Sequence, residues 1–254
     1  MTRRSLLWSL GLGFLVVALL LPPSYSSRGP ARKAHCRHQL KQIGLALKAY
    51  HADYGKFPPA FIADADGNPM HSWRVLILPY LGQQELYDQY RFDEPWDSEY
   101  NAQLATSSGK TQGLGFSCPG DADSEVKDHT NYVAVVGPET AMPGDKSRSL
   151  GELANGGSET ILLVEIRDSK IRWFEPRDLD FGEMSFGIND PSGKGIGSYH
   201  SDYGDYWSRI GLRKAAWITH VLMADGTVRD LPESTPPREV QRLLLVNKTQ
   251  VKGN

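Results

Sequence analysis

The sequence ARKAHCRHQLKQIGLALKAYHADY, residues 31–54, sets the architecture of this 254-residue chain. Its apolar residues recur at alternating steps of four and three, which places them along one face of a helix, while basic residues occupy another face. We predict that the apolar face packs against the rest of the domain, because pairing with a partner helix would need a longer heptad pattern. Gly55 and the following Phe57-Pro58-Pro59 end the helix. The predicted stripe comprises Cys36, Leu40, Ile43, Leu47, Tyr50 and Tyr54.

An uncharged apolar segment precedes this helix. Residues 5–21 read SLLWSLGLGFLVVALLL, and as a helix they would be about 25 Å long, near the lower limit for crossing a bilayer. A core helix would show a broader polar face than Ser5 and Ser9 provide. We therefore predict a basic tail (1–4), a transmembrane signal-anchor (5–21), a linker (22–30) and one folded domain (31–254).

The fate and orientation of this segment leave alternatives open. Arg3-Arg4 before an apolar run also describes a signal peptide, and Ser24-Tyr25-Ser26 is a candidate cleavage site. The length of the run and Pro22-Pro23 after it favour an uncleaved anchor. Counting the basic residues after the segment places the domain in the cytoplasm, whereas the short tail resembles a signal anchor whose basic flank lies on anionic headgroups outside. We predict a single-pass protein of the cytoplasmic membrane with its C-terminal domain outside the cytoplasm.

The net charge of −2 conceals an uneven distribution. Residues 1–52 carry eight Lys and Arg and no acid, so the other 202 residues carry 20 basic and 30 acidic groups. No basic field covers the whole molecule, and nucleic acid is therefore not expected as a partner. The basic portion belongs to the membrane segment and the helix that leaves it, and the acidic portion to the folded domain.

After the helix, the pattern changes to short elements. Residues 73–81 form a dense apolar stretch that could be helix or strand, with Ser72 as a fair N-cap and Pro79 opposing a long helix. Residues 85–90 predict a short helix, and 106–115 a mobile loop. Apolar, β-branched or aromatic runs predict strands at 131–136, 160–166 and 171–174, with a turn at Asp168-Ser169. One amino-terminal helix followed mainly by antiparallel strands is an α+β arrangement.

The carboxyl end carries the strongest local turn signal. Asp225-Gly226 separates the apolar runs 220–224 and 227–231, which predicts a hairpin with a two-residue type I′ turn. Pro236 opens a final helix that we expect Thr235 to cap, with Val240, Leu243 and Leu244 on its apolar side. Residues 182–211, rich in Gly, Ser, Asp and Tyr, predict a long surface excursion.

Motifs for common chemistries are absent from the sequence, which has no phosphate-binding glycine loop and no G-x-S-x-G. Cys36 and Cys118 are too few for a structural zinc site by themselves. In an exported domain they could pair and close a loop of about 80 residues, worth a few kcal/mol. Two separate buried thiols are the alternative.

Two groups of acidic residues could bind a metal. Asp64, Asp66 and Asn68 resemble the start of a calcium loop, but Val75 stands where a bidentate Glu would be needed, so we favour a solvated turn. The acidic run with His200 could supply ligands or an acid–base pair, although spacing alone does not bring its members together. That run comprises Glu175, Asp178, Asp180 and Glu183. His51, His71 and His220 are expected to be hydrogen-bonded within packed structure.

Several sequence blocks resemble one protein family, in order along most of the chain. They are CRHQLKQIGLALKAYH (36–51), YGKFPPA (54–60), ADADGNPMHSW (63–73), RVLILPYL (74–81), TNYVAVVG (130–137) and ADGTV (224–228). The family is domain of unknown function 1559, whose members are large pseudopilin-like envelope proteins abundant in planctomycete bacteria. The resemblance implies a pilin-like, type II secretion-like architecture, with an amino-terminal helix half in the membrane and half packed on an antiparallel sheet. It implies no established enzyme activity.

The chain departs from the family pattern in two places. Members usually begin with a prepilin cleavage sequence, Gly followed by Phe-Thr-Leu-Ile-Glu, which the apolar segment here lacks. Members also tend to place a His nine residues before the terminal Asp-Gly. His200 is the equivalent here, but 24 residues separate it from Asp225-Gly226, and 203–217 looks like an insertion.

These observations favour a membrane-anchored, pseudopilin-like envelope protein with a structural or interaction role and no cofactor. Its expected partners are the membrane, through residues 5–21, and other envelope proteins or further copies of the chain. The alternative is an exported metal-dependent enzyme or calcium-binding module that uses the carboxylates around Asp178 and His200, or Asp64 and Asp66.

Overall fold

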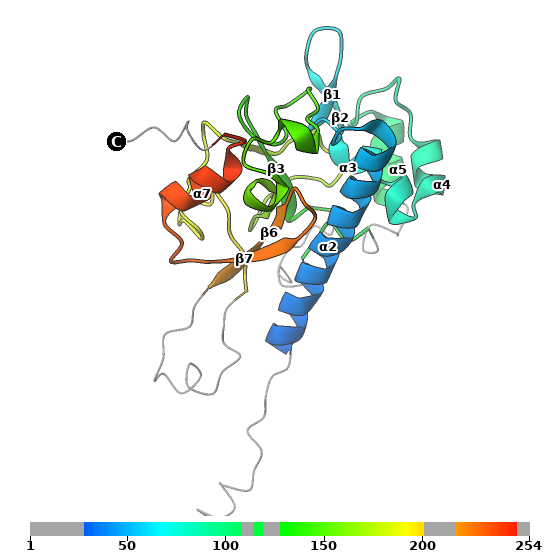
Figure 1. Cartoon of the computed structure of the whole chain (residues 1–254). Coiled ribbons are helices and arrows are strands. Elements are labelled where there is room, and N and C mark those ends of the chain that lie inside the picture. The colour runs from blue at the N-terminus through cyan, green and yellow to red at the C-terminus, as the bar shows by residue number, and fades with distance from the viewer. Residues whose placement is uncertain (1–27, 108–113, 119–127, 201–216, 248–254) are drawn as a thin grey trace, which may run out of the picture.

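The computed structural model describes residues 28–107, 114–118, 128–200 and 217–247. They form a mixed helix and sheet domain (Figure 1). The helices are α2 (Arg28–Tyr54), α3 (Trp73–Leu76), α4 (Gln84–Gln89), α5 (Glu99–Ser107) and α7 (Pro237–Leu244), with short 3₁₀ turns at Pro79–Leu81, Leu150–Glu152 and Gly157–Glu159. The strands are β1 (Phe61–Ala63), β2 (Pro69–Ser72), β3 (Tyr132–Val136), β4 (Ile161–Glu165), β5 (Leu179–Asp180), β6 (Ile218–Met223) and β7 (Val228–Pro232).

The predicted membrane anchor, residues 5–21, lies outside the described residues, as do the basic tail 1–4 and most of the linker. Among the helices that are described, none combines the length and the apolar character that a membrane crossing requires.

Helix α2 is the predicted amphipathic helix, and it begins at Arg28, three residues earlier than expected. Pro30 lies in its first turn, where a missing N–H removes no helical hydrogen bond. The predicted stripe is buried from Cys36 to Leu47, but Tyr54 is 64% exposed and stacks on Tyr50 at the helix end. Its placement in the buried face was therefore wrong. Residues 30–35 are mostly exposed, and Figure 1 shows these first turns projecting from the domain.

The main sheet has the strand order β5-β3-β4-β6-β7. All neighbours pair antiparallel except β5, which runs parallel to β3. Both faces of the sheet are covered. In β3, Tyr132 and Ala134 belong to the core that contains α2, and Val133 and Val135 to the core that contains α7. Covering on both faces explains why the central strands read as continuous apolar runs.

The hairpin β6–β7 is present, but its turn differs from the prediction. The N–H of Gly226 donates to the carbonyl of Met223, so Ala224 and Asp225 are the central residues and Gly226 follows at φ +84°. A type I′ turn would need positive φ at Asp225, which does not have it. The observed loop is a type I turn followed by a left-handed glycine.

Two further predictions were wrong. Residues 171–174 form no strand, because Asp168 and Lys170 adopt φ values of +46° and +51° and redirect the chain. Trp173 and Phe174 then pack in the core, with Trp173 stacked on Phe116 at 5.8 Å. The expected surface excursion 182–211 is described only to residue 200, and there it supplies buried core residues, namely Met184, Ile188 and Ile196.

The short helices were predicted in part, and their caps and ends differ in detail. The hydroxyl of Ser72 accepts the N–H of Arg74, which confirms the N-cap of α3, and Pro79 starts a separate 3₁₀ turn. The predicted helix 85–90 is α4, shifted by one residue, and α5 extends into the start of the predicted loop 106–115. Helix α7 buries its predicted apolar side, but Pro236 is its N-cap, and the hydroxyl of Thr235 donates instead to the carbonyl of Pro232.

Candidate functional site

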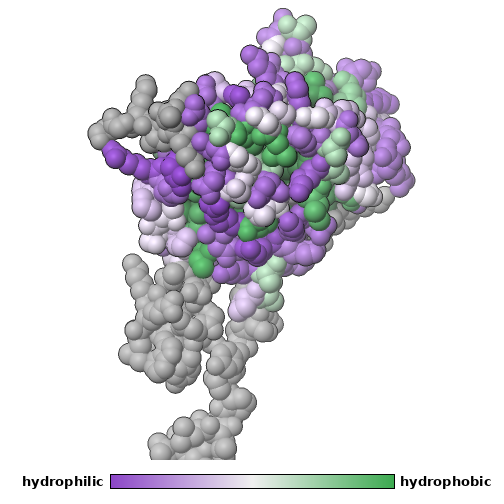
Figure 2. Space-filling view, in the orientation of Figure 1, coloured by the Kyte–Doolittle hydropathy of each residue, from purple (hydrophilic) through white to green (hydrophobic). Residues whose placement is uncertain are grey.

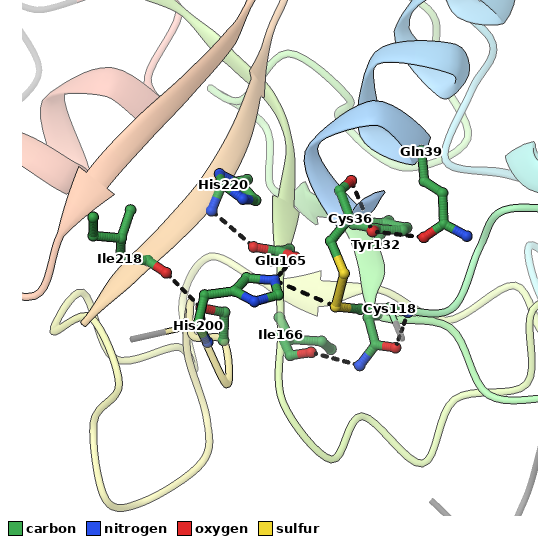
Figure 3. Close-up of a disulfide and its surroundings, with 11 residues drawn as sticks. Cys36, Gln39, Cys118, Tyr132, Glu165, Ile166, His200, Ile218 and His220 are labelled. Carbon is green, nitrogen blue, oxygen red and sulfur yellow. Dashed lines mark hydrogen bonds and ion pairs between the residues drawn. A yellow bond between two sulfur atoms is a disulfide. The ribbon is translucent and has the colours of Figure 1, made fainter. Parts of the chain in front are cut away.

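A disulfide joins Cys36 of α2 to Cys118, with 5.2 Å between the two Cα atoms. Of the two alternatives left open by the sequence, the structure contains the bonded one. Both residues are buried, and hydrogen bonds fix the surrounding backbone (Figure 3). The N–H of Cys118 donates to the side-chain oxygen of Asn131 at 2.7 Å, and the hydroxyl of Tyr132 donates to the carbonyl of Cys36 at 3.0 Å. The disulfide therefore ties the long helix to the body of the domain.

A histidine and a glutamate lie directly beside this disulfide. The Nε2 atom of His200 is 3.3 Å from the sulfur of Cys118 and 3.2 Å from Oε1 of Glu165 (Figure 3). Glu165 ends strand β4, and its side chain and that of His200 are each only 2% exposed. One ligand atom from each of the four residues lies within 4.8 Å of the others. The structure thus gathers two sulfurs, an imidazole and a carboxylate in one buried cluster.

A second histidine extends this cluster toward the surface. The backbone N–H of His220, in β6, donates to Oε2 of Glu165 at 2.8 Å, and its ring lies 5.2 Å from that of His200. Its Nδ1 atom is 2.9 Å from a carboxylate oxygen of Asp230, which also pairs with Arg37 of α2. The ring Nε2 of His220 is buried, and it has no hydrogen-bond partner among the residues that the structure describes. Because the carboxylate holds the proton on Nδ1, this Nε2 carries a lone pair in the neutral ring.

Asp178, which the sequence had grouped with His200, belongs to a different buried pair. Its Oδ1 accepts from the guanidinium of Arg74 at 2.6 Å, from the N–H of Ala134 at 2.8 Å and from the indole N–H of Trp73 at 3.2 Å. Arg74 is fully buried and also donates to the carbonyl of Tyr132. Burial raises the pKa of Asp178 and lowers that of Arg74, and the opposite charge of each partner counters both shifts. The pair joins α3 to β3.

The rest of the predicted acidic run does not gather at His200. Glu175 pairs with Arg177, and Oδ1 of Asp180 accepts the N–H of Gly182. Asp178, Asp180 and Glu183 all lie on the wall of one open cavity of about 310 Å³, which Arg177 and Lys194 also line. The hydrogen bonds of His200 go instead to the cluster at the disulfide. The structure therefore does not form the acid–base group around Asp178 and His200.

The calcium-like sequence forms the turn between β1 and β2. One oxygen of Asp64 accepts the backbone N–H groups of Asp66 and Asn68, and its other oxygen accepts the Asn68 side-chain amide. These hydrogen bonds lower the pKa of Asp64, with the Asn68 side chain contributing most. Among the described residues, the candidate metal-binding group contains neither Asp64 nor Asp66. The three residues thus form a hydrogen-bonded turn between the two strands.

The family-motif residues have separate surroundings. Asp225 accepts the N–H and the hydroxyl of Thr227. The carbonyl of Gly226 accepts from Lys41 of α2 at 2.7 Å, and a Cβ on Gly226 would meet the Lys48 side chain at 2.6 Å. The Asp-Gly turn therefore docks on α2, whereas His200 contacts the disulfide and Glu165.

Sequence reasoning missed Glu165, Arg74 and the bonding of His220 to Asp230. A usable signal existed for the first two, because each is a charged residue inside an apolar run, TILLVEI or WRVLIL. A charge at such a position must find a buried partner. Nothing in the sequence spacing identifies which partner that is.

Comparisons with known proteins give one result. A model of the family described as protein of unknown function (DUF1559) matches residues 26–161. The matched range includes α2 and both cysteines, and it ends at the start of β4, before Glu165 and His200. Neither a search of curated proteins nor a search of solved structures found a match.

Proposed function

The chain belongs to the DUF1559 family, and from that membership we propose that it is a membrane-anchored, pseudopilin-like envelope protein with a structural or interaction role. The proposal places the anchor at residues 5–21, in the cytoplasmic membrane, and the folded domain outside the cytoplasm. The anchor stays attached, because the sequence lacks the prepilin cleavage motif.

The arrangement of α2 is the observation that carries this proposal. The helix packs on the sheet from Cys36 onward, and its first turns leave the domain (Figure 1). At 1.5 Å per residue its 27 residues span about 40 Å. A helix whose first turns project from the domain while the remainder packs on it is suited to hold a domain at a distance from a membrane, as the pilin-like architecture requires.

The disulfide supports a location outside the cytoplasm. Disulfides persist in oxidising compartments and are rare in the reducing cytoplasm. Here the bond joins the projecting helix to the domain, so it would resist a pull on the anchor. Hydrophilic residues form the rim and much of the lower part of the face shown in Figure 2, around a group of apolar residues in its upper centre.

An interaction role is favoured over the metal-enzyme alternative that the sequence raised. Asp178 forms an ion pair with Arg74, and Asp64 accepts hydrogen bonds within its own turn. The exposed first turns of α2, which include Arg32, His35 and the half-buried Lys33, are where we place contacts with anionic headgroups, envelope proteins or further copies of the chain.

Fractionation of cells that express the full chain tests the proposal. The chain should sediment with membranes, resist extraction by salt, and be released by detergent. Protease added to spheroplasts should degrade the domain while a cytoplasmic control protein stays intact. A chain in the soluble fraction, or a domain protected until the membrane is opened, would contradict the proposal.

A further inference from the structure

We infer that Cys36, Cys118, Glu165 and His200 form a zinc site when the disulfide is reduced, so that a metal ion replaces the covalent bond between α2 and the domain. This inference does not depend on the anchor or on the proposed role. It concerns the buried cluster alone.

The donor set is one that zinc prefers. Structural zinc sites are tetrahedral and use Cys sulfur, His nitrogen and carboxylate oxygen. Two cysteines alone are too few, and the fold supplies the missing two ligands from β4 and from residue 200, far from both cysteines in sequence. All four residues are buried, so the site is closed in the manner of structural rather than catalytic zinc.

The spacing of the donor atoms already approaches a coordination sphere. Bond lengths of about 2.0–2.3 Å place neighbouring ligands of tetrahedral zinc about 3.3–3.8 Å apart. The Nε2 atom of His200 lies 3.3 Å from the Cys118 sulfur and 3.2 Å from Oε1 of Glu165. The remaining donor pairs lie within 4.8 Å of one another. Zinc binding therefore requires the two sulfurs to separate, which bond breakage permits, and the remaining donors to draw closer.

The surroundings orient the carboxylate ligand. The backbone N–H of His220 holds Oε2 of Glu165, which leaves Oε1 facing His200 and the sulfurs (Figure 3). Outer hydrogen bonds of this kind fix the ligands of metal sites. In native proteins a buried polar atom without a partner often accompanies a redox role or a bound ion, and Nε2 of His220 is such an atom beside the cluster.

Exchange between the disulfide and the zinc-bound form of the cluster requires an electron donor and an electron acceptor. A dithiol reductant transfers two electrons and two protons to the Cys36–Cys118 bond, which gives two thiols and the oxidised reductant. Zinc then binds both sulfurs and displaces the two thiol protons to solvent. In the reverse direction, a disulfide oxidant takes up the two electrons and two protons from solvent and becomes a dithiol, the Cys36–Cys118 bond forms again, and the zinc ion leaves.

Cobalt titration of the full chain in mild detergent, under anaerobic conditions, tests the inference. The phosphine-reduced chain should bind one Co²⁺ and show the sulfur-to-cobalt charge transfer and visible bands of a tetrahedral thiolate site. Equimolar zinc should displace the cobalt and abolish both the charge-transfer band and the visible bands. The oxidised chain should show neither set of bands. A reduced chain that binds no cobalt, or binds it without charge transfer, would overturn the inference, as would a reduced chain that unfolds and does not refold with zinc.

Variants then assign the ligands. His200→Ala and Glu165→Gln should each weaken cobalt binding by more than the ~10–100-fold that loss of an outer hydrogen bond costs. Asp66→Asn is the matched control, because it alters an exposed acidic residue in the β1–β2 turn and should leave binding unchanged. Tryptophan fluorescence checks the fold of each variant. Folded His200 and Glu165 variants that bind like the wild type would refute the assignment.

Discussion

Removing the Asp178 carboxylate should destabilise the domain strongly, although this residue lies outside the disulfide cluster. In Asp178→Ala, three donors lose their acceptor at once, namely the guanidinium of Arg74, the indole of Trp73 and the N–H of Ala134. The side chains of Asp178 and Arg74 are 2% and 0% exposed, so water does not replace the lost contacts.

The expected cost follows from this burial. Removal of one partner from a buried ion pair costs about 3–5 kcal/mol, because the other charge stays buried and unpaired. At about 2–4 °C per kcal/mol for a domain of this size, the melting temperature should fall by roughly 6–20 °C. Asp178→Asn keeps an acceptor oxygen of the same shape and should lose only about 1.5–3 kcal/mol. The double variant Arg74→Met/Asp178→Leu removes both charges and should be more stable than Asp178→Ala.

Thermal and denaturant unfolding of the full chain in detergent, followed by tryptophan fluorescence, measures these differences. Asp66→Ala, at an exposed position, is the control and should change stability by less than about 0.5 kcal/mol. If Asp178→Ala unfolds within about 1 kcal/mol of the wild type, the pair is not the buried structural element described here. A double variant less stable than Asp178→Ala would refute the electrostatic reasoning in the same way.

Three further perturbations have defined outcomes. The variant Cys36→Ala/Cys118→Ala should have a free energy of unfolding about 2–4 kcal/mol lower than the oxidised wild type, since the disulfide closes a loop with a sequence separation of 82. Chemical unfolding of both proteins in chelator measures this difference, and an unchanged midpoint would contradict it. Gly44→Ala should lower the melting temperature, because its Cβ would lie 2.6 Å from Cδ1 of Leu222. Overpacking of this kind costs about 1–3 kcal/mol, which outweighs a gain in helix propensity of up to about 1 kcal/mol. Leu45→Ala, at an exposed position of the same helix, is the comparison. Burial lowers the pKa of His71 below 6.5, so the stability that its neutral ring provides should be present above pH 6.5 and decline as the pH falls through the folded-state pKa. NMR titration of the ring, and unfolding measured at about pH 5, should reveal this decline. The variant His71→Gln should make the free energy of unfolding less dependent on pH in this range.

The elements that sequence predicted well are those with a strong local cause. Helix α2 follows from a periodic apolar stripe, and the β6–β7 hairpin from Asp225-Gly226 between two apolar runs. The turn type of that hairpin was mispredicted because the Asp-Gly pair is compatible with more than one loop. Its register here is set by the pairing of Leu222 with Val228.

The elements that sequence mispredicted depend on tertiary contacts. Residues 171–174 have strand-like composition, but stacking of Trp173 on Phe116 is available only after the chain folds. Tyr54 continues the helical period beyond the point where the domain surface ends. Met184 and Ile196 lie in a stretch whose glycines and serines indicate a surface loop, although the stretch packs in the core beside α7.

The buried cluster was only half predictable. Pairing of Cys36 with Cys118 was one of two alternatives from the cysteine count. The register of β4 against β6, which brings Val164 opposite Val221, places His220 beside Glu165. His200 joins them because its carbonyl accepts the N–H of Ile218 at the start of β6. No spacing rule connects residues 36, 118, 165 and 200, so the arrangement could be found only from the fold.

The mass of the mature protein in the membrane fraction shows whether the chain keeps both its anchor and its disulfide. Cells are treated with an alkylating reagent before lysis, and the chain is then extracted in detergent and weighed intact without reduction. We predict a chain that retains residues 1–27, sediments with membranes and carries no alkyl group, because both cysteines are in the disulfide. A shortened chain, a soluble chain, or one alkylated at both Cys36 and Cys118 would contradict a retained anchor that carries an oxidised domain outside the cytoplasm.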